Sequence, residues 1–248
     1  MLTMKRYLII LYAVVAALAS SVASGAESAD RILNVNVHLI AGLSNTTNNY
    51  VKCFPEISDL NSSVGQSLGV GVDGVMMLGR RWGIGTAINF IHTSRRMDMA
   101  VSGFSAKSVS NVFQRNSYYV IDVPIYARWH TRIASEVRWN IDGGIYYSYG
   151  TGGKQKNTIY DAKINDLGQL FTTRTELEAG YYNDGNAFVN SYRRADVGLH
   201  IATGLTFKRH ITVGLRAHLG LKDVSRNTGI VNPSARNVDL MALLGWTF

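Results

Sequence analysis

The chain has 248 residues and a formal net charge of +8, yet only 17% of its residues are charged. A soluble domain usually has about a quarter of its residues charged. Beyond the N-terminal segment, no apolar run is long enough for a transmembrane helix, which excludes a helical membrane protein. The single cysteine, Cys53, excludes an internal disulfide framework.

The N-terminal segment predicts export from the cytoplasm. Lys5 and Arg6 precede an apolar stretch, 7–18, which has the length of a signal peptide. The alternative is an uncleaved membrane anchor, but the stretch is too short to span a bilayer. We therefore divide the chain into a cleaved signal peptide, 1–26, and one mature domain, 27–248.

The last twelve residues predict a strand with two different faces. Alternate positions up to Trp246 and Phe248 are all apolar, whereas the other register carries every polar residue, including Asp239. A period of two is typical of a strand. A strand that ends on an aromatic residue resembles the last strand of bacterial outer-membrane β-barrels. That resemblance implies that Trp246 and Phe248 form an assembly signal for the barrel-insertion machinery.

Seven earlier segments alternate in the same way, so we predict an all-β, eight-stranded antiparallel transmembrane β-barrel. Each segment is about long enough for a tilted strand to cross the hydrocarbon core. The predicted strands are 33–44, 66–78, 82–92, 117–130, 137–149, 192–207, 211–221 and 237–248.

The predicted connections alternate between short and long, which is typical of barrels with short periplasmic turns and long extracellular loops. A soluble eight-stranded barrel would place its apolar residues inside, and alternation alone does not distinguish the two. The signal peptide and the aromatic residues near strand ends, such as Trp82, Trp129 and Trp139, favour the outer membrane of a Gram-negative bacterium. The long connections are 45–65, 93–116, 150–191 and 222–236.

Two segments carry a family resemblance. The run Y-Y-V-I-D-V-P-I-Y-A-R, 118–128, resembles a strand of the PorT-like outer-membrane β-barrels of Bacteroidota, although Asp122 stands where that pattern usually has Glu. The segment 139–149, with Gly143 or Gly144 and a following Tyr, resembles the next strand of that family. The resemblance implies a fold, a compartment and no catalytic residue. Some members resemble a component of the type IX secretion system.

The polar register of the strands predicts an interior charge network. An eight-stranded barrel is just wide enough for side chains to fill it, and a buried charge is tolerated only when it is paired. We therefore expect a network of Arg–Asp bridges that plugs the barrel; the alternative is a narrow gated pore. The predicted members, with His38 beside them, are Asp73, Asp122, Arg128, Arg138, Asp142, Arg194, Asp196, His200, Arg216, His218 and Asp239.

An enzyme is the second class of function that we consider. Small outer-membrane barrels include lipid A-modifying enzymes, and His92 with Ser94, or His200 with Ser148 or Ser191, could form a pair near the extracellular end. A nucleophile also needs a group that orients its base, and no spacing here indicates one. We therefore predict no enzymatic activity, no cofactor and no metal site, since the histidines lack close ligand spacing.

The extracellular loops are expected to carry the function, because binding residues concentrate on loops. The loop 150–191 is far longer than an ordinary connection, and the loop 93–116 is basic, with Arg95, Arg96 and Arg115. The expected partners are outer-membrane lipid and lipopolysaccharide, together with secretion-system or surface proteins. Nucleic acid is not expected, because the basic residues form no stripe.

Overall fold

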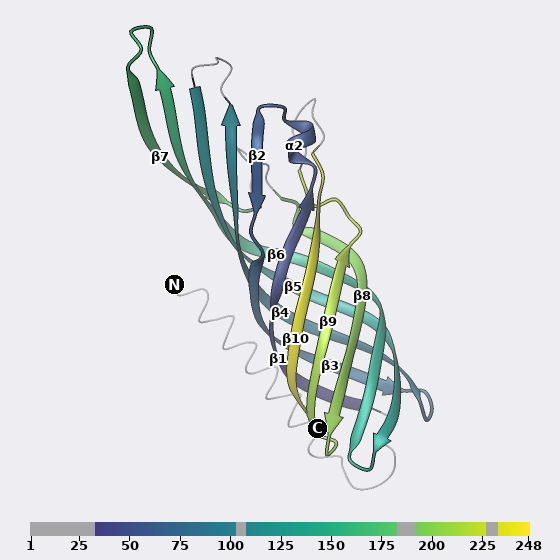
Figure 1. The fold of residues 1–248 in the computed structure, drawn as a ribbon. Coiled ribbons are helices and arrows are strands. Elements are labelled where there is room, and N and C mark those ends of the chain that lie inside the picture. The colour runs from purple at the N-terminus through teal and green to yellow at the C-terminus, as the bar shows by residue number, and fades with distance from the viewer. Residues whose placement is uncertain (1–32, 103–107, 183–191, 227–232) are drawn as a thin grey trace.

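A computed structural model describes residues 33–102, 108–182, 192–226 and 233–248 (Figure 1). Within these residues, eight long strands close into an antiparallel ring in the order β4–β3–β1–β10–β9–β8–β6–β5, and β5 pairs back onto β4. The prediction of an all-β, eight-stranded barrel is confirmed. The predicted signal peptide lies outside the described residues.

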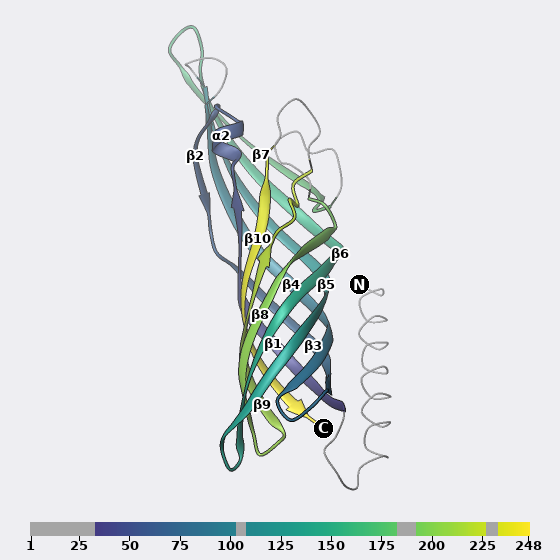
Figure 2. The ribbon, with the colours of Figure 1, turned by 90° about the vertical axis from the view of Figure 1, so that its right-hand side faces the viewer.

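The ring strands are tilted to the barrel axis and follow one another around it in chain order (Figure 2). Three further elements lie at the extracellular end: α2 (Tyr50–Cys53), β2 (Ile57–Ser62) and β7 (Leu170–Gly180). The ring strands are β1 (Leu33–Asn48), β3 (Gly65–Met77), β4 (Trp82–Ser102), β5 (Ser108–Ala134), β6 (Val137–Ile164), β8 (Ala195–Phe207), β9 (Ile211–Gly220) and β10 (Ala235–Thr247).

The first and last strands close the ring. β1 pairs with the whole length of β10 from Asn36 onward, with Ala41 opposite Ala242. The Phe248 N–H then donates to the Val35 carbonyl at 2.9 Å. In its membrane-spanning part the barrel therefore has no free strand edge that could pair with another chain.

The two faces of the ring have opposite chemistry. Leu39, Leu68, Ile125 and Leu215 are exposed on the outside. Inside, the buried set includes charged and amide side chains such as Asn89, which is fully buried. An apolar outside and a polar inside are what a barrel in lipid requires. None of the helices in the described residues is long and apolar enough to cross a membrane.

Three strands are much longer than predicted. β4 runs on to Ser102, β5 starts at Ser108 and β6 continues to Ile164, where the sequence had indicated loops. β2 pairs with β4 and β7 pairs with β6 beyond the ring. The predicted loops 93–116 and 150–191 are thus largely strands, and they build a sheet that rises from one side of the extracellular mouth (Figure 1).

Candidate functional site

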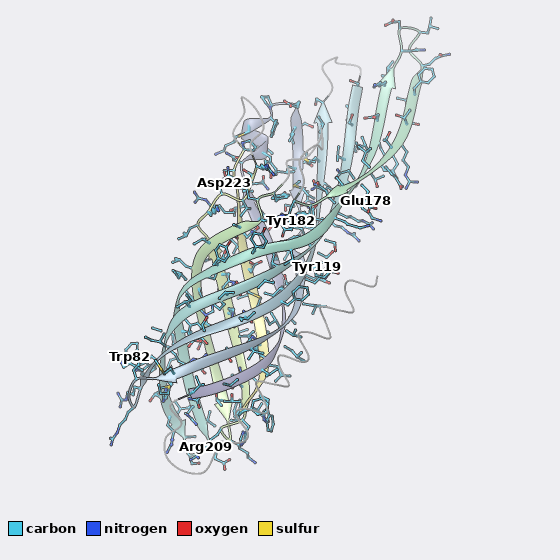
Figure 3. The ribbon with its side chains drawn as sticks, turned by 180° about the vertical axis from the view of Figure 1, so that it is seen from behind. Trp82, Tyr119, Glu178, Tyr182, Arg209 and Asp223 are labelled. Atoms are coloured by element: carbon cyan, nitrogen blue, oxygen red, sulfur yellow. The ribbon has the colours of Figure 1, made fainter. Side chains whose placement is uncertain are left out.

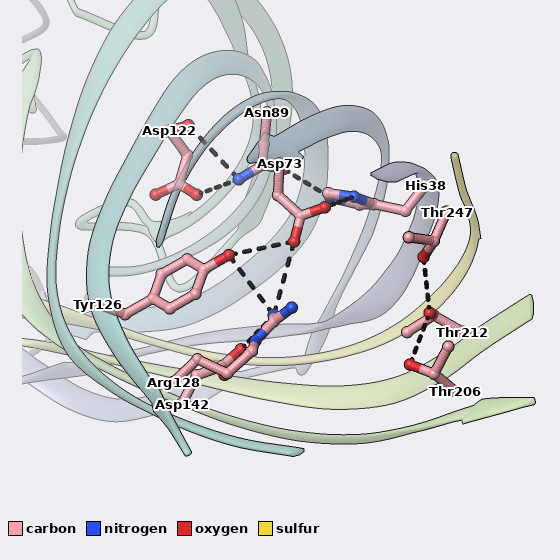
Figure 4. A network of polar contacts seen from close by, with 10 residues as sticks. All are labelled: His38, Asp73, Asn89, Asp122, Tyr126, Arg128, Asp142, Thr206, Thr212 and Thr247. Atoms are coloured by element: carbon pink, nitrogen blue, oxygen red, sulfur yellow. Dashed lines mark hydrogen bonds and ion pairs between the residues drawn. The ribbon is translucent and has the colours of Figure 1, made fainter. Parts of the chain in front are cut away.

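Arg128 on β5 holds the lower part of the interior together (Figure 4). Its Nε and Nη2 each lie 2.7 Å from an oxygen of Asp142, which is a bidentate pair. Nη2 also lies 3.6 Å from Asp73, whose carboxylate accepts a 3.1 Å hydrogen bond from the Tyr126 hydroxyl. Bidentate Arg–carboxylate pairs are among the stronger polar contacts in proteins.

The polar contacts continue upward through the middle of the barrel. His38 Nδ1 lies 3.9 Å from Asp73, and its Nε2–H donates to Asn89 Oδ1 at 2.8 Å. The Asn89 amide nitrogen in turn donates to Asp122 at 2.9 Å. Four strands contribute to this chain of contacts: β1, β3, β4 and β5.

Two histidines extend the network to the opposite wall. His218 Nδ1 lies 3.7 Å from Asp122, and its Nε2 shares a 2.8 Å hydrogen bond with His200 Nδ1. The Tyr146 ring stacks on His218 at 4.3 Å, and its hydroxyl donates to Asp196. Side chains from opposite walls therefore meet across the interior, which leaves little room for a continuous channel.

Four predicted members stand outside these contacts. Arg138 lines a small cavity at the lower end of the barrel, and Asp239 is half-buried opposite Ser44. Arg194 is exposed at the upper rim, where it donates to the Gly150 carbonyl, so its prediction as an interior residue is wrong. Arg216 is buried, but its Nε and Nη1 have no hydrogen-bond partner, and no carboxylate of the described residues pairs with it.

The cavity at the lower end is lined by a ladder of hydroxyl groups. Thr206, Thr212 and Thr247 are joined by hydrogen bonds of 3.1 and 3.2 Å (Figure 4). Arg128 also lines the cavity. Figure 3 places Arg209 and Trp82 at this end, with Tyr182, Glu178 and Asp223 at the other. The cavity therefore lies at the end of the short turns.

A second set of side chains closes the extracellular mouth. Arg95 on β4 is buried, and its Nη2 donates to the Tyr181 hydroxyl at 2.6 Å. Its guanidinium also lies over the Tyr192 ring at 5.1 Å, a cation–π contact. We call Arg95 and the surrounding tyrosines the tyrosine cap; its tyrosines are Tyr50, Tyr118, Tyr181, Tyr182 and Tyr192.

The tyrosine cap is buried and tightly stacked. Tyr181 stacks on Tyr118 at 4.3 Å and on Tyr192 at 4.6 Å, so one ring links β5 to the segment before β8. Burial raises the pKa of the Tyr181 hydroxyl well above its ordinary value. The sequence did not predict the cap, because Arg95 was interpreted as one of several solvated cations in a loop.

The tip of the β6–β7 hairpin carries apolar side chains far above the membrane. Ile164, Leu167, Leu170 and Phe171 are all exposed, and Leu167 is 83% accessible. The turn between them is ordered, because Asn165 Oδ1 accepts hydrogen bonds from the Leu167 and Gln169 N–H groups. Exposed apolar patches of this kind mark interaction surfaces.

A histidine–serine contact lies on the outside of the barrel. His92 Nε2 is 2.8 Å from the Ser117 hydroxyl, and the His92 ring packs on Tyr119 at 4.7 Å. The sequence had suggested Ser94 as the partner instead. No carboxylate among the described residues orients His92, and none of them forms a group of three His, Cys, Asp or Glu side chains that could hold a metal ion.

Of the other pairings considered from sequence, His200 with Ser148 does not form. His200 is engaged with His218, while Ser148 lies opposite Asp196 in the β6–β8 register. Ser191 lies outside the described residues.

The family assignment agrees with this geometry. A family model described as "Outer membrane protein beta-barrel domain" matches residues 23–226. The chain belongs to this family. As a member of the outer membrane protein beta-barrel domain family, it is an outer-membrane protein. The narrower PorT-like identity stays a prediction.

Solved structures of other outer-membrane barrels are weakly similar. The attachment invasion locus protein Ail of Yersinia pestis is 12% identical, with a TM-score of 0.34 and coverage of 87% of this chain and 98% of Ail. OprG of Pseudomonas aeruginosa is 7% identical, with a TM-score of 0.36 and coverage of 87% and 95%. Neisserial surface protein A is 10% identical, with a TM-score of 0.30 and coverage of 90% and 100%. No curated protein matches the chain.

Proposed function

We propose that this protein is a closed, non-enzymatic outer-membrane barrel that acts through its extracellular sheet. The observation that carries the proposal is the exposed apolar tip of the β6–β7 hairpin. A protein gains nothing from holding Leu167 and Phe171 in water on an ordered turn unless a partner covers them. The partner class that fits is a surface or secretion-system protein, in keeping with the PorT-like resemblance.

The route to the membrane is part of the same proposal. Residues 1–26 act as a cleaved signal peptide, and the mature chain reaches the barrel-insertion machinery from the periplasm. In the folded barrel, the membrane-spanning strands then serve to hold the extracellular sheet at the cell surface.

The test combines gene deletion with complementation. The tip variant carries Ile164→Thr, Leu167→Ser, Leu170→Thr and Phe171→Thr, which leaves the rest of the hairpin intact. We expect the deletion strain to lose secreted or surface-anchored proteins, and the tip variant to restore few of them at a normal outer-membrane level.

The matched control removes exposed apolar residues elsewhere on the same surface. Val51 and Val64 are exposed near α2 and β2, and Val51→Thr with Val64→Thr should complement fully. Full complementation by the tip variant would contradict the proposal.

One observation favours a lipid-modifying enzyme as the second candidate. The Ser117 hydroxyl and His92 face outward, where the acyl chains and sugars of an outer-leaflet lipid would lie. The two candidates differ in the mass of lipid A. Our proposal predicts the same lipid A mass in wild-type, deletion and Ser117→Ala strains, whereas a change of mass would favour the enzyme.

A further inference from the structure

Three cations form a row across neighbouring strands on the outer surface. Arg96 on β4 lies directly opposite Arg115 on β5, and Arg115 lies directly opposite Lys156 on β6. Arg96 and Arg115 are exposed, as is most of the Lys156 side chain. We call these three residues the cationic row.

The row is unfavourable within the protein alone. Residues directly opposite in an antiparallel pair have Cβ atoms about 4.5–5.5 Å apart, and like charges there destabilise the sheet. In the part of the chain that the structure describes, the only carboxylate in contact with the row is Glu178 on β7, which lies 3.4 Å from Lys156 and also pairs with Lys154 at 2.6 Å. Among the described residues, no acid pairs with Arg96 or Arg115.

The negative charge of Glu178 is already neutralised by two lysines. Hydrogen bonds from Lys154 and Lys156 hold the pKa of the Glu178 carboxyl below its ordinary value. One carboxylate shared between two lysines leaves the two arginines uncompensated. An anion with more than one negative charge would therefore compensate the cationic row.

The height of the row indicates which anion. Just below it, the outer surface of β4 and β5 carries Ser94 and Ser117, and below these Phe90 stacks on Tyr119 at 5.7 Å. Aromatic side chains of this kind lie at the membrane interface. Figure 3 shows Tyr119 below Glu178 on the same side of the barrel. The row thus lies at the level of the lipid headgroups.

We propose that the cationic row binds the phosphate groups of lipopolysaccharide in the outer leaflet. The planar guanidinium groups of Arg96 and Arg115 match the bidentate geometry of phosphate oxygens, and Lys156 adds a point charge. The Ser94 and Ser117 hydroxyls lie where the sugars of the same lipid would contact the barrel. The site needs no contribution from the hairpin tip and is independent of the tip's partner.

The binding test uses the full mature protein in phosphatidylcholine nanodiscs. The probes are purified bisphosphorylated lipid A and the same lipid after removal of its phosphates. Arg96→Gln, Arg115→Gln and Lys156→Gln together should weaken binding of the bisphosphorylated lipid by about tenfold or more. They should leave the weaker binding of the dephosphorylated lipid unchanged.

The matched control removes the same charge from the opposite end of the barrel. Arg80→Gln, Arg81→Gln and Lys208→Gln change three cations in the short turns, and this variant should bind as the wild type does. Equal binding by the row variant and the wild type would overturn the proposal. An equal loss in the control variant would also overturn it, because it would show only a general charge effect.

A second measurement distinguishes a loss of lipid A binding from a loss of folding. Arg115→Gln alone removes the middle charge of the row and relieves repulsion with both neighbours. In neutral detergent it should unfold at the same temperature as the wild type or a higher one. With bisphosphorylated lipid A its rise in unfolding temperature should be smaller; an equal rise would contradict the site.

Discussion

Arg128 and Arg216 both point into the barrel, but their surroundings differ. Arg128 makes a bidentate pair with Asp142 and approaches Asp73. Arg216 is only 4% exposed and leaves two of its nitrogens without partners. From sequence, both were expected to neutralise an aspartate. In the structure Arg128 makes direct ion pairs, whereas Arg216 acts on Asp122 only at longer range.

Replacing Arg128 by alanine should destabilise the barrel strongly. The change leaves Asp142 and Asp73 buried without their cation, which typically costs about 3–5 kcal/mol. Reversible urea unfolding in lipid vesicles, followed by tryptophan fluorescence, measures this directly. A loss below about 1 kcal/mol would show that the two aspartates do not depend on Arg128.

Replacing Arg216 by methionine should have the opposite effect on the free energy of unfolding. Arg216 gives up its hydration without a direct ion pair among the described residues, and only the longer-range attraction of the Asp122 charge compensates it. A methionine of similar length keeps the packing, so the free energy of unfolding should stay equal or rise. The same urea experiment applies, and a loss comparable to that of Arg128→Ala would show that Arg216 is paired after all.

At the scale of elements, the ring strands could be predicted and the extracellular sheet could not. The predicted starts at Trp82, Val137 and Ile211 coincide with the observed ones, because outward apolar and inward polar residues alternate there. Above the membrane the alternation is reversed, with apolar residues on the inner face and polar residues on the outer face. Met97 is buried on the inner face and Arg96 is exposed on the outer face, so the pattern no longer looks like a strand in lipid.

The sequence could predict which residues belong to the interior network, but not which of them contact one another. The period of two places His38, Asp73 and Asp122 on the inner face, but pairing depends on strand register across the barrel. Register also decides that Arg194 lies at the rim rather than inside. The tyrosine cap depends on contacts between β4, β5 and the segment before β8, which no local pattern reports.

The end of β10 gives a prediction about assembly. The Trp246 ring packs on His210 at 5.2 Å, and the half-buried Phe248 donates a backbone hydrogen bond to Val35. Deleting Phe248 therefore removes little from the folded barrel. We expect unassembled protein in the periplasm of cells, but normal heat-modifiable migration after refolding in detergent. Normal outer-membrane levels of the deletion variant would contradict an assembly role.

The connection between β9 and β10 gives a pH-dependent prediction. The Asp223 carboxylate accepts hydrogen bonds from the Ser225 N–H, the Ser225 hydroxyl and the Ala235 N–H at 2.8–2.9 Å. Partial burial raises the pKa of Asp223, but these hydrogen bonds outweigh it and the net pKa lies below the ordinary value. The stabilisation is therefore present above the unfolded pKa and is lost as the pH falls through the folded one.

Asp223→Asn should loosen this connection at pH 7 but not at low pH. Limited proteolysis at pH 7 should cut the variant faster than the wild type within 222–236. Only when the pH falls below this lowered folded pKa is the wild-type carboxyl also protonated, and there an acid protease should cut both at similar rates. A difference that persists unchanged as the pH falls through the folded pKa would show that the charge of Asp223 does not hold the connection.

At the scale of the whole molecule, two separate sets of side chains close one barrel. The charge network fills the middle, and the tyrosine cap closes the extracellular mouth. A small cavity near Thr212 lies at the lower end. The surfaces left for function are the outer surface of β4–β6 and the sheet above the membrane, which is why we assign binding roles there and no transport role to the interior.

Single-channel recording of the purified protein in a planar lipid bilayer tests this closed interior most directly. The connected network from Asp142 to Asp196 and the cap around Arg95 predict no steady conductance at moderate voltage. A control with Arg95→Ala should also stay closed, because the charge network lies below the cap. A large, steady conductance of the wild-type barrel would contradict the account.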